Sequence, residues 1–95
     1  MGATVRFVTT GDDIHLTCNA ELSPKPPLKV YWYRDDILID SLLPRGGISV
    51  VTEKKRRISN LLISRVTQRD AGNYTCAPQN SQADSVMIHI IRGKF

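Results

Sequence analysis

Few side chains in this chain of 95 residues have the types and spacing that catalysis or metal binding requires. His15 and His89 are the only histidines, and each alternates with apolar residues that would face a core. This pattern predicts two solvent-exposed strand histidines rather than a metal site or an acid–base pair. No Gly-x-Ser-x-Gly motif accompanies the serines. The sequence therefore predicts no catalytic residue, no metal site and no cofactor.

Two pairs of adjacent carboxylates are the next candidates for chemistry, Asp12 with Asp13 and Asp35 with Asp36. Either pair could supply acid–base groups or calcium ligands. Adjacent residues of a strand or turn point to different sides, however, and Asp is favoured in turns because its side chain bonds to the local backbone. We interpret both pairs as turn residues.

The two cysteines, Cys18 and Cys76, could be free thiols or one structural disulfide. Trp32 follows the first by fourteen residues, and Tyr74 precedes the second by two within the run DAGNYTC, which begins at Asp70. This ordered set is the signature of an immunoglobulin-type β-sandwich, whose disulfide joins facing sheets and carries a packed indole. Asp70 and Tyr74 would fasten the turn before the second cysteine strand. The pattern favours the disulfide, and a disulfide implies an oxidising, extracellular compartment.

The strands that must position these residues are read from alternation with a period of two. The clearest is 14–20, where Ile14, Leu16 and Cys18 would face inward. The other strands are expected at 4–9, 29–34, 37–39, 48–52, 61–66, 74–78 and 86–90. Loops are expected at 23–27, 41–47 and 80–83, where Pro, Gly or polar residues break the pattern. No helix longer than one turn is expected.

The cysteine spacing leaves little room for both extra strands of a variable-type domain. We therefore predict an all-β, immunoglobulin-like β-sandwich of the I-set or constant-2 type, with seven to eight strands in Greek-key order. It forms a single domain over 1–95, and Met1 and Gly2 are interpreted as an added start. Residues 1–15 lack the apolar core of a secretory leader, and no apolar run approaches the roughly 18 residues of a membrane span.

The run Lys54, Lys55, Arg56 and Arg57 is the most concentrated charge in a chain of formal net charge +4. Four cations on one turn could bind a sulfated glycan or an anionic lipid surface. The simpler interpretation is a hairpin tip that charge keeps soluble. Nucleic acid is disfavoured, because a disulfide-bonded domain is extracellular and no aromatic residues are interleaved with the charges.

Two further features concern the protein surface. Asn73, Tyr74 and Thr75 form an N-glycosylation sequon, although Asn73 could instead be a turn residue. If Tyr74 is buried, Asn73 should be exposed. Tyr31 and Tyr33 would lie on the outer side of strand 29–34, where they could contact another protein or simply shield cross-strand neighbours.

Four segments carry a resemblance to a known family. They are Ser23 to Tyr33 (SPKPPLKVYWY), Gly46 to Lys54 (GGISVVTEK), Tyr74 to Asn80 (YTCAPQN) and Ser85 to Gly93 (SVMIHIIRG). Together they resemble the second immunoglobulin domain of the defective proboscis extension response (Dpr) family, which includes the nematode two-immunoglobulin-domain (zwei Ig) proteins. The basic run after GGISVVTEK departs from the family, whose members usually carry a less charged turn there.

The resemblance implies an extracellular recognition protein of the nervous system, secreted or held at the cell surface, that acts in adhesion and synaptic partner choice. In such proteins the amino-terminal domain usually contacts partner immunoglobulin-superfamily proteins. The present domain would then be the membrane-proximal spacer.

Overall fold

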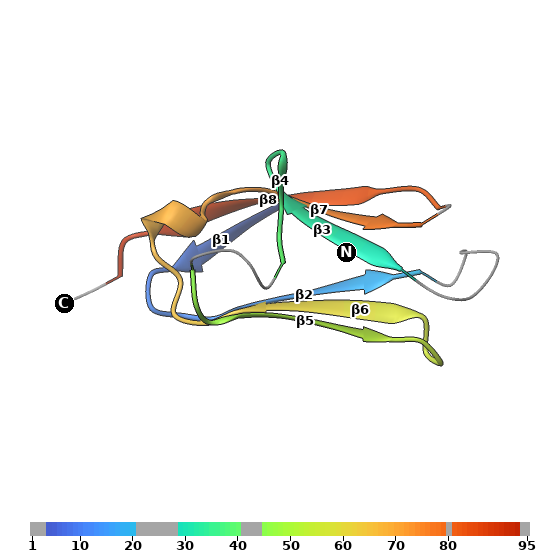
Figure 1. Ribbon diagram of the computed structural model, residues 1–95. Coiled ribbons are helices and arrows are strands. Elements are labelled where there is room, and N and C mark those ends of the chain that lie inside the picture. The colour runs from blue at the N-terminus through green and yellow to red at the C-terminus, as the bar shows by residue number, and fades with distance from the viewer. Residues whose placement is uncertain (1–3, 21–28, 41–44, 80, 94–95) are drawn as a thin grey trace.

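A computed structural model describes residues 4–20, 29–40, 45–79 and 81–93 of the chain. Over these residues it has eight β-strands and one short 3-10 helix (Figure 1). The elements are β1 (Val5–Thr9), β2 (Ile14–Asn19), β3 (Val30–Arg34), β4 (Ile37–Leu38), β5 (Ile48–Glu53), β6 (Ile58–Ile63), η1 (Gln68–Asp70), β7 (Gly72–Pro78) and β8 (Asp84–Ile91).

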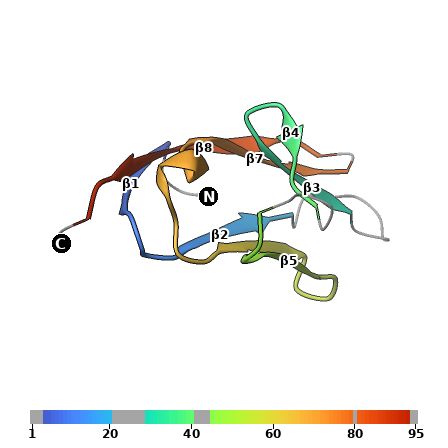
Figure 2. The same cartoon turned by 60° about the vertical axis from the view of Figure 1, so that its left-hand side comes forward.

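The strands form two sheets that face each other, as Figures 1 and 2 show from two sides. The larger sheet has the order β1-β8-β7-β3-β4, and the smaller has the order β2-β6-β5. The short β4 extends the larger sheet while β5 extends the smaller one. This arrangement lies between the constant and variable types of immunoglobulin sandwich. The predicted all-β sandwich is confirmed.

The core lies between the sheets, where alternate strand residues meet. In β2 the apolar residues Ile14, Leu16 and Cys18 are buried, whereas the residues between them are exposed. The same alternation runs through β6, β7 and β8. The buried core comprises Val8, Ile14, Leu16, Cys18, Trp32, Ile39, Leu61, Ile63, Val66, Tyr74, Cys76, Val86 and Ile88.

The first strand, β1, lies at an edge of the larger sheet and pairs in parallel with β8 from Val5 opposite Met87 to Thr9 opposite Ile91. The chain then turns through Gly11, whose φ of 92° is a conformation that glycine adopts without steric cost. This turn carries the chain from the larger sheet into β2 of the smaller one.

The strand expected over 61–66 differs from prediction at both ends. It begins earlier, at Ile58, and ends at Ile63. Arg65 has a φ of 50°, which interrupts the extended backbone. Val66 is nevertheless buried, and its N–H donates to the carbonyl of Asp12 at 2.9 Å. The apolar character of Val66 therefore predicted a strand residue, although Val66 is a buried residue of a loop.

Smaller differences concern the edges and ends of the sheets. The strand expected at 37–39 is only two residues long, although Ile39 is buried behind it. Ile90, near the end of β8, is half-buried and packs against the core. Several predictions lie outside the described residues: the loop at 23–27, part of the loop at 41–47, and the interpretations of Asn80 and of Met1 with Gly2.

Candidate functional site

The centre of the sandwich holds the cysteine and tryptophan signature. A disulfide joins Cys18 of β2 to Cys76 of β7 and so links the two sheets. Trp32 lies opposite Cys76 on the neighbouring strand, and its side chain is 1% exposed. Its indole N–H donates to Ser59 Oγ at 2.9 Å, and that buried hydroxyl lies 3.0 Å from Thr52 Oγ1. A buried indole N–H needs a partner, but no local sequence pattern identifies Ser59 as that partner.

The turn before β7 is fastened by Tyr74. Its buried hydroxyl donates to the backbone carbonyl of Asp70 at 2.6 Å. Burial raises the pKa of Tyr74 to about 12, and the negative charge of Asp70 adds to the rise. The Asp70 carboxylate in turn accepts from the N–H of Thr67 at 2.8 Å, which fixes η1. Asp70 and Tyr74 thus lie where the sequence predicted.

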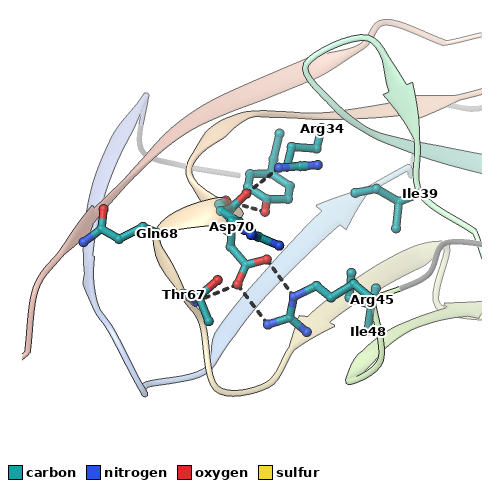
Figure 3. A pocket seen from close by; sticks show the side chains of 9 residues that line it. Arg34, Ile39, Arg45, Ile48, Thr67, Gln68 and Asp70 are labelled. Atoms are coloured by element: carbon teal, nitrogen blue, oxygen red, sulfur yellow. Dashed lines mark hydrogen bonds and ion pairs between the residues drawn. The ribbon is translucent and has the colours of Figure 1, made fainter.

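Arg45 completes this corner, as Figure 3 shows. Its Nε lies 2.7 Å from Asp70 Oδ1 and its Nη2 lies 2.9 Å from Asp70 Oδ2, a bidentate ion pair. Nη2 also donates to the carbonyl of Ser64 at 2.9 Å. No local sequence pattern identifies Arg45 as the partner of Asp70, because the two residues are 25 positions apart.

A hollow opens beside this corner, with Ile39, Ile48 and the Tyr74 ring among its walls (Figure 3). Two of its cationic side chains are already bound: Arg45 holds Asp70, and Arg34 Nη1 donates to the carbonyl of Arg69 at 2.5 Å. These contacts join η1 to β3 of the larger sheet and to the segment before β5 of the smaller sheet. We therefore interpret the corner as structural.

The basic run lies at the tip of the β5–β6 hairpin. Arg57 is half-buried, and its carbonyl accepts from the N–H of Ala20 at 2.8 Å. Arg56 Nη1 lies 3.5 Å from Glu53 Oε1, in an exposed pair that contributes little. Lys54 and Lys55 are exposed. Of the four cations in the basic run, Arg57 is therefore held by its backbone contact, whereas the side chains of Lys54, Lys55 and Arg56 lie at the surface.

The tyrosines predicted to face outward do so, but unequally. Tyr31 is 41% exposed, whereas Tyr33 is half-buried. Asn73 and Thr75 of β7 lie on the same outer face of the larger sheet, because they alternate with the buried Tyr74. Asn73 is half-buried rather than exposed, which corrects the prediction: Met87 pairs with it across the sheet, and Asp35 Oδ1 accepts from its N–H at 3.1 Å.

The two histidines lie on different sheets. His15 Nε2 lies 2.9 Å from Asn60 Oδ1 on the outer face of the smaller sheet. His89 stacks on Phe7 at a ring-centroid distance of 5.1 Å on the larger sheet. Within the described part of the chain, no three His, Cys, Asp or Glu residues are grouped as a metal site would require.

The two facing sheets, the disulfide between them and the fastened tyrosine corner define an immunoglobulin-type sandwich. The chain belongs to the immunoglobulin domain family, whose model matches residues 2–80. It is 36% identical to the limbic system-associated membrane protein of Rattus norvegicus over 72 residues, which is 76% of this chain and 19% of that protein. It is 40% identical to IgLON family member 5 of Homo sapiens over 68 residues, or 70% of this chain and 19% of that protein.

Contactin-2 of Homo sapiens is 36% identical over 88 residues, covering 90% of this chain and 8% of that protein. Among solved structures, Dpr2 Ig1-Ig2 in complex with DIP-Theta Ig1-Ig3 matches with a TM-score of 0.77 and 26% identity, covering 97% of this chain and 48% of that chain. The first Ig domain of the mouse polymeric immunoglobulin receptor matches at 0.78 with 18% identity, over 100% of this chain and 96% of that chain, which shows the fold alone.

The chain therefore spans about a fifth or less of the length of these curated relatives. It is an immunoglobulin domain similar to neuronal cell-surface adhesion proteins. Among the described residues, no helix has the length and apolar character needed to cross a membrane.

Proposed function

We propose that this chain is the second, membrane-proximal immunoglobulin domain of a Dpr-like neuronal recognition protein, and that it acts as a spacer in synaptic partner choice. The protein would be extracellular, secreted or held at the cell surface, and a neighbouring domain would contact partner immunoglobulin-superfamily proteins. The observation that carries this proposal is the likeness to Dpr2 Ig1-Ig2 along 97% of the chain. The four sequence segments that resemble the second domain of that family support the same assignment.

The shape of the domain favours a spacer. It is elongated, with principal extents of 48 × 27 × 23 Å. Its disulfide and the bidentate pair of Arg45 with Asp70 tie the two sheets and the corner together. A rigid body of this length would hold a neighbouring domain at a fixed distance and orientation, whereas a flexible linker would not.

Binding to candidate immunoglobulin-superfamily partners tests this proposal. Light scattering would compare this domain alone with the same domain joined to the one that precedes it in the full-length protein. We expect only the tandem form to bind, with unchanged affinity when an unrelated immunoglobulin domain replaces this one. Capture of a partner by the isolated domain would contradict the spacer assignment.

A second candidate function is binding of a sulfated glycan at the β5–β6 tip. Lys54 and Lys55 are exposed there, and Arg56 has a side-chain exposure of 71%. Three cations around one turn would bind sulfate groups mainly through charge, so the affinity would fall with added salt.

Heparin chromatography tests this second candidate. The double variant Lys54→Glu/Lys55→Glu lowers the formal net charge by four, as does a control, Lys29→Glu/Arg92→Glu, at exposed positions elsewhere. We expect the tip variant to elute at much lower salt than the control. Equal elution of the two variants would show that only net charge matters and would remove the hairpin tip as a glycan site.

A further inference from the structure

The outer face of the larger sheet carries large exposed apolar side chains and no charged strand residue. Strand residues that point away from the core on β1, β3, β4, β7 and β8 include no Asp, Glu, Lys or Arg. We call this surface the uncharged face. Its large apolar members are Val5 (47% exposed), Phe7 (67%), Tyr31 (41%), Leu38 (40%), Met87 (36%) and Ile91 (49%). Exposed apolar side chains that gather on one face often mark a site that another group covers.

The sequon lies within the uncharged face. Asn73 and Thr75 both point outward from β7, which runs between β8 and β3 (Figure 1). Met87 of β8 pairs directly with Asn73. Tyr33 pairs with Thr75, so it lies one strand spacing across (about 4.8 Å) and two residues along (about 7 Å) from Asn73. The Asn73 side-chain amide makes no hydrogen bond to the described residues, so that amide is available for modification.

We propose that Asn73 carries an N-linked glycan whose first sugars lie on the uncharged face and cover it. In the transfer, Asn73 Nδ2 forms a bond to C1 of a sugar carried on a lipid diphosphate. The C1–O bond to the diphosphate breaks, the lipid diphosphate leaves, and the amide loses one proton. A glycosyltransferase of the secretory pathway catalyses this transfer from the lipid-linked sugar, which is the donor.

The chemistry of the uncharged face suits a sugar. A pyranose ring has a C–H surface that packs on aromatic and thioether groups, and its hydroxyls remain free for water. Met87 lies on one side of Asn73 and Tyr33 on the other, so the first sugars meet an apolar partner in either direction. The glycan and a protein partner would therefore compete for the same surface. A contact through Tyr31 and Tyr33 would be open only to unglycosylated protein.

Secretion of the chain from eukaryotic cells, followed by mass spectrometry of the peptide that contains Asn73, tests the covalent step. The coverage is tested by the rate at which peroxide oxidises Met87, since thioether oxidation follows exposure. We expect oxidation severalfold slower in the glycosylated chain than in Thr75→Val, which removes the sequon. Thr75→Ser keeps both the sequon and a hydroxyl near Ser85, and it should still be glycosylated.

When the glycan is trimmed to a single sugar, Met87 should remain largely protected from oxidation by peroxide. Asn73→Gln gives a second unglycosylated form in case Thr75→Val does not fold. Secreted protein with unmodified Asn73 would overturn the proposal. So would a glycosylated chain whose Met87 oxidises as fast as in the unglycosylated variants, because the glycan would then extend away from the sheet. Neither result depends on the spacer or heparin experiments.

Discussion

The buried hydroxyl of Tyr74 should make the stability of this domain fall sharply at alkaline pH. Its pKa is raised to about 12 in the folded chain, whereas an unfolded tyrosine ionises near 10. Above pH 10 the unfolded chain therefore loses this proton before the folded chain does, and stability declines until pH passes 12. The difference of about two pKa units corresponds to about 3 kcal/mol in total, of which about half is lost by pH 11.

The variant Tyr74→Phe isolates this effect. At neutral pH it loses the hydrogen bond to the Asp70 carbonyl, which should cost about 1.5 kcal/mol. Because phenylalanine does not ionise, the variant lacks the alkaline decline that Tyr74 causes. The two stability curves should therefore cross near pH 11, and the variant should be the more stable protein at pH 12.

Urea unfolding of the parent and the variant from pH 8 to 12 measures this difference, with short incubations to protect the disulfide. The matched control is Tyr31→Phe, at an exposed position. The difference in the free energy of unfolding between Tyr31→Phe and the parent should not change with pH in this way. A stability gap between parent and Tyr74→Phe that stays constant from pH 9 to 12 would refute the reasoning, because the hydroxyl would then ionise equally in both states.

Three further predictions concern the ties that hold the sandwich. Replacing Arg45 with Met leaves the carboxylate of Asp70 buried without its ion-pair partner, and urea unfolding should show a loss of about 3 kcal/mol. The variant Arg45→Lys should recover only part of this stability, because lysine cannot form the bidentate pair. Ser59→Ala removes the acceptor of the Trp32 indole and should cost about 1–3 kcal/mol, with a shift in tryptophan fluorescence; an unchanged midpoint would mean that another group accepts this proton. Replacing both half-cystines with alanine should cost about 4 kcal/mol by loop entropy, measured against the oxidised parent, and a loss below about 1 kcal/mol would contradict the entropic estimate.

Local sequence patterns predicted most of the fold. The alternation in β2 and the DAGNYTC run before β7 identified the strands and the disulfide, because a period of two and a short turn motif are set by neighbours in sequence. Strand ends were less predictable. Val66 is buried in a loop for reasons of packing, and apolar character alone could not separate it from a strand residue.

Contacts between distant segments could not be predicted. Arg45 and Ser59 reach their partners across 25 and 27 residues, and no local pattern selects them from the other arginines and serines. The place of Phe7 beside His89 depends on the parallel pairing of β1 with β8, which only the assembled sheet defines. The gathering of Asn73 and the tyrosines on one face likewise follows from the strand register.

The parallel pairing of β1 and β8 has a mechanical consequence. Tension that enters the domain at the start of β1 and leaves at the end of β8 pulls the two strands past each other along their length. The backbone hydrogen bonds over the five paired positions from Val5 to Thr9 then resist together, instead of opening one at a time like a zipper. Under tension in this direction the domain should therefore rupture slowly.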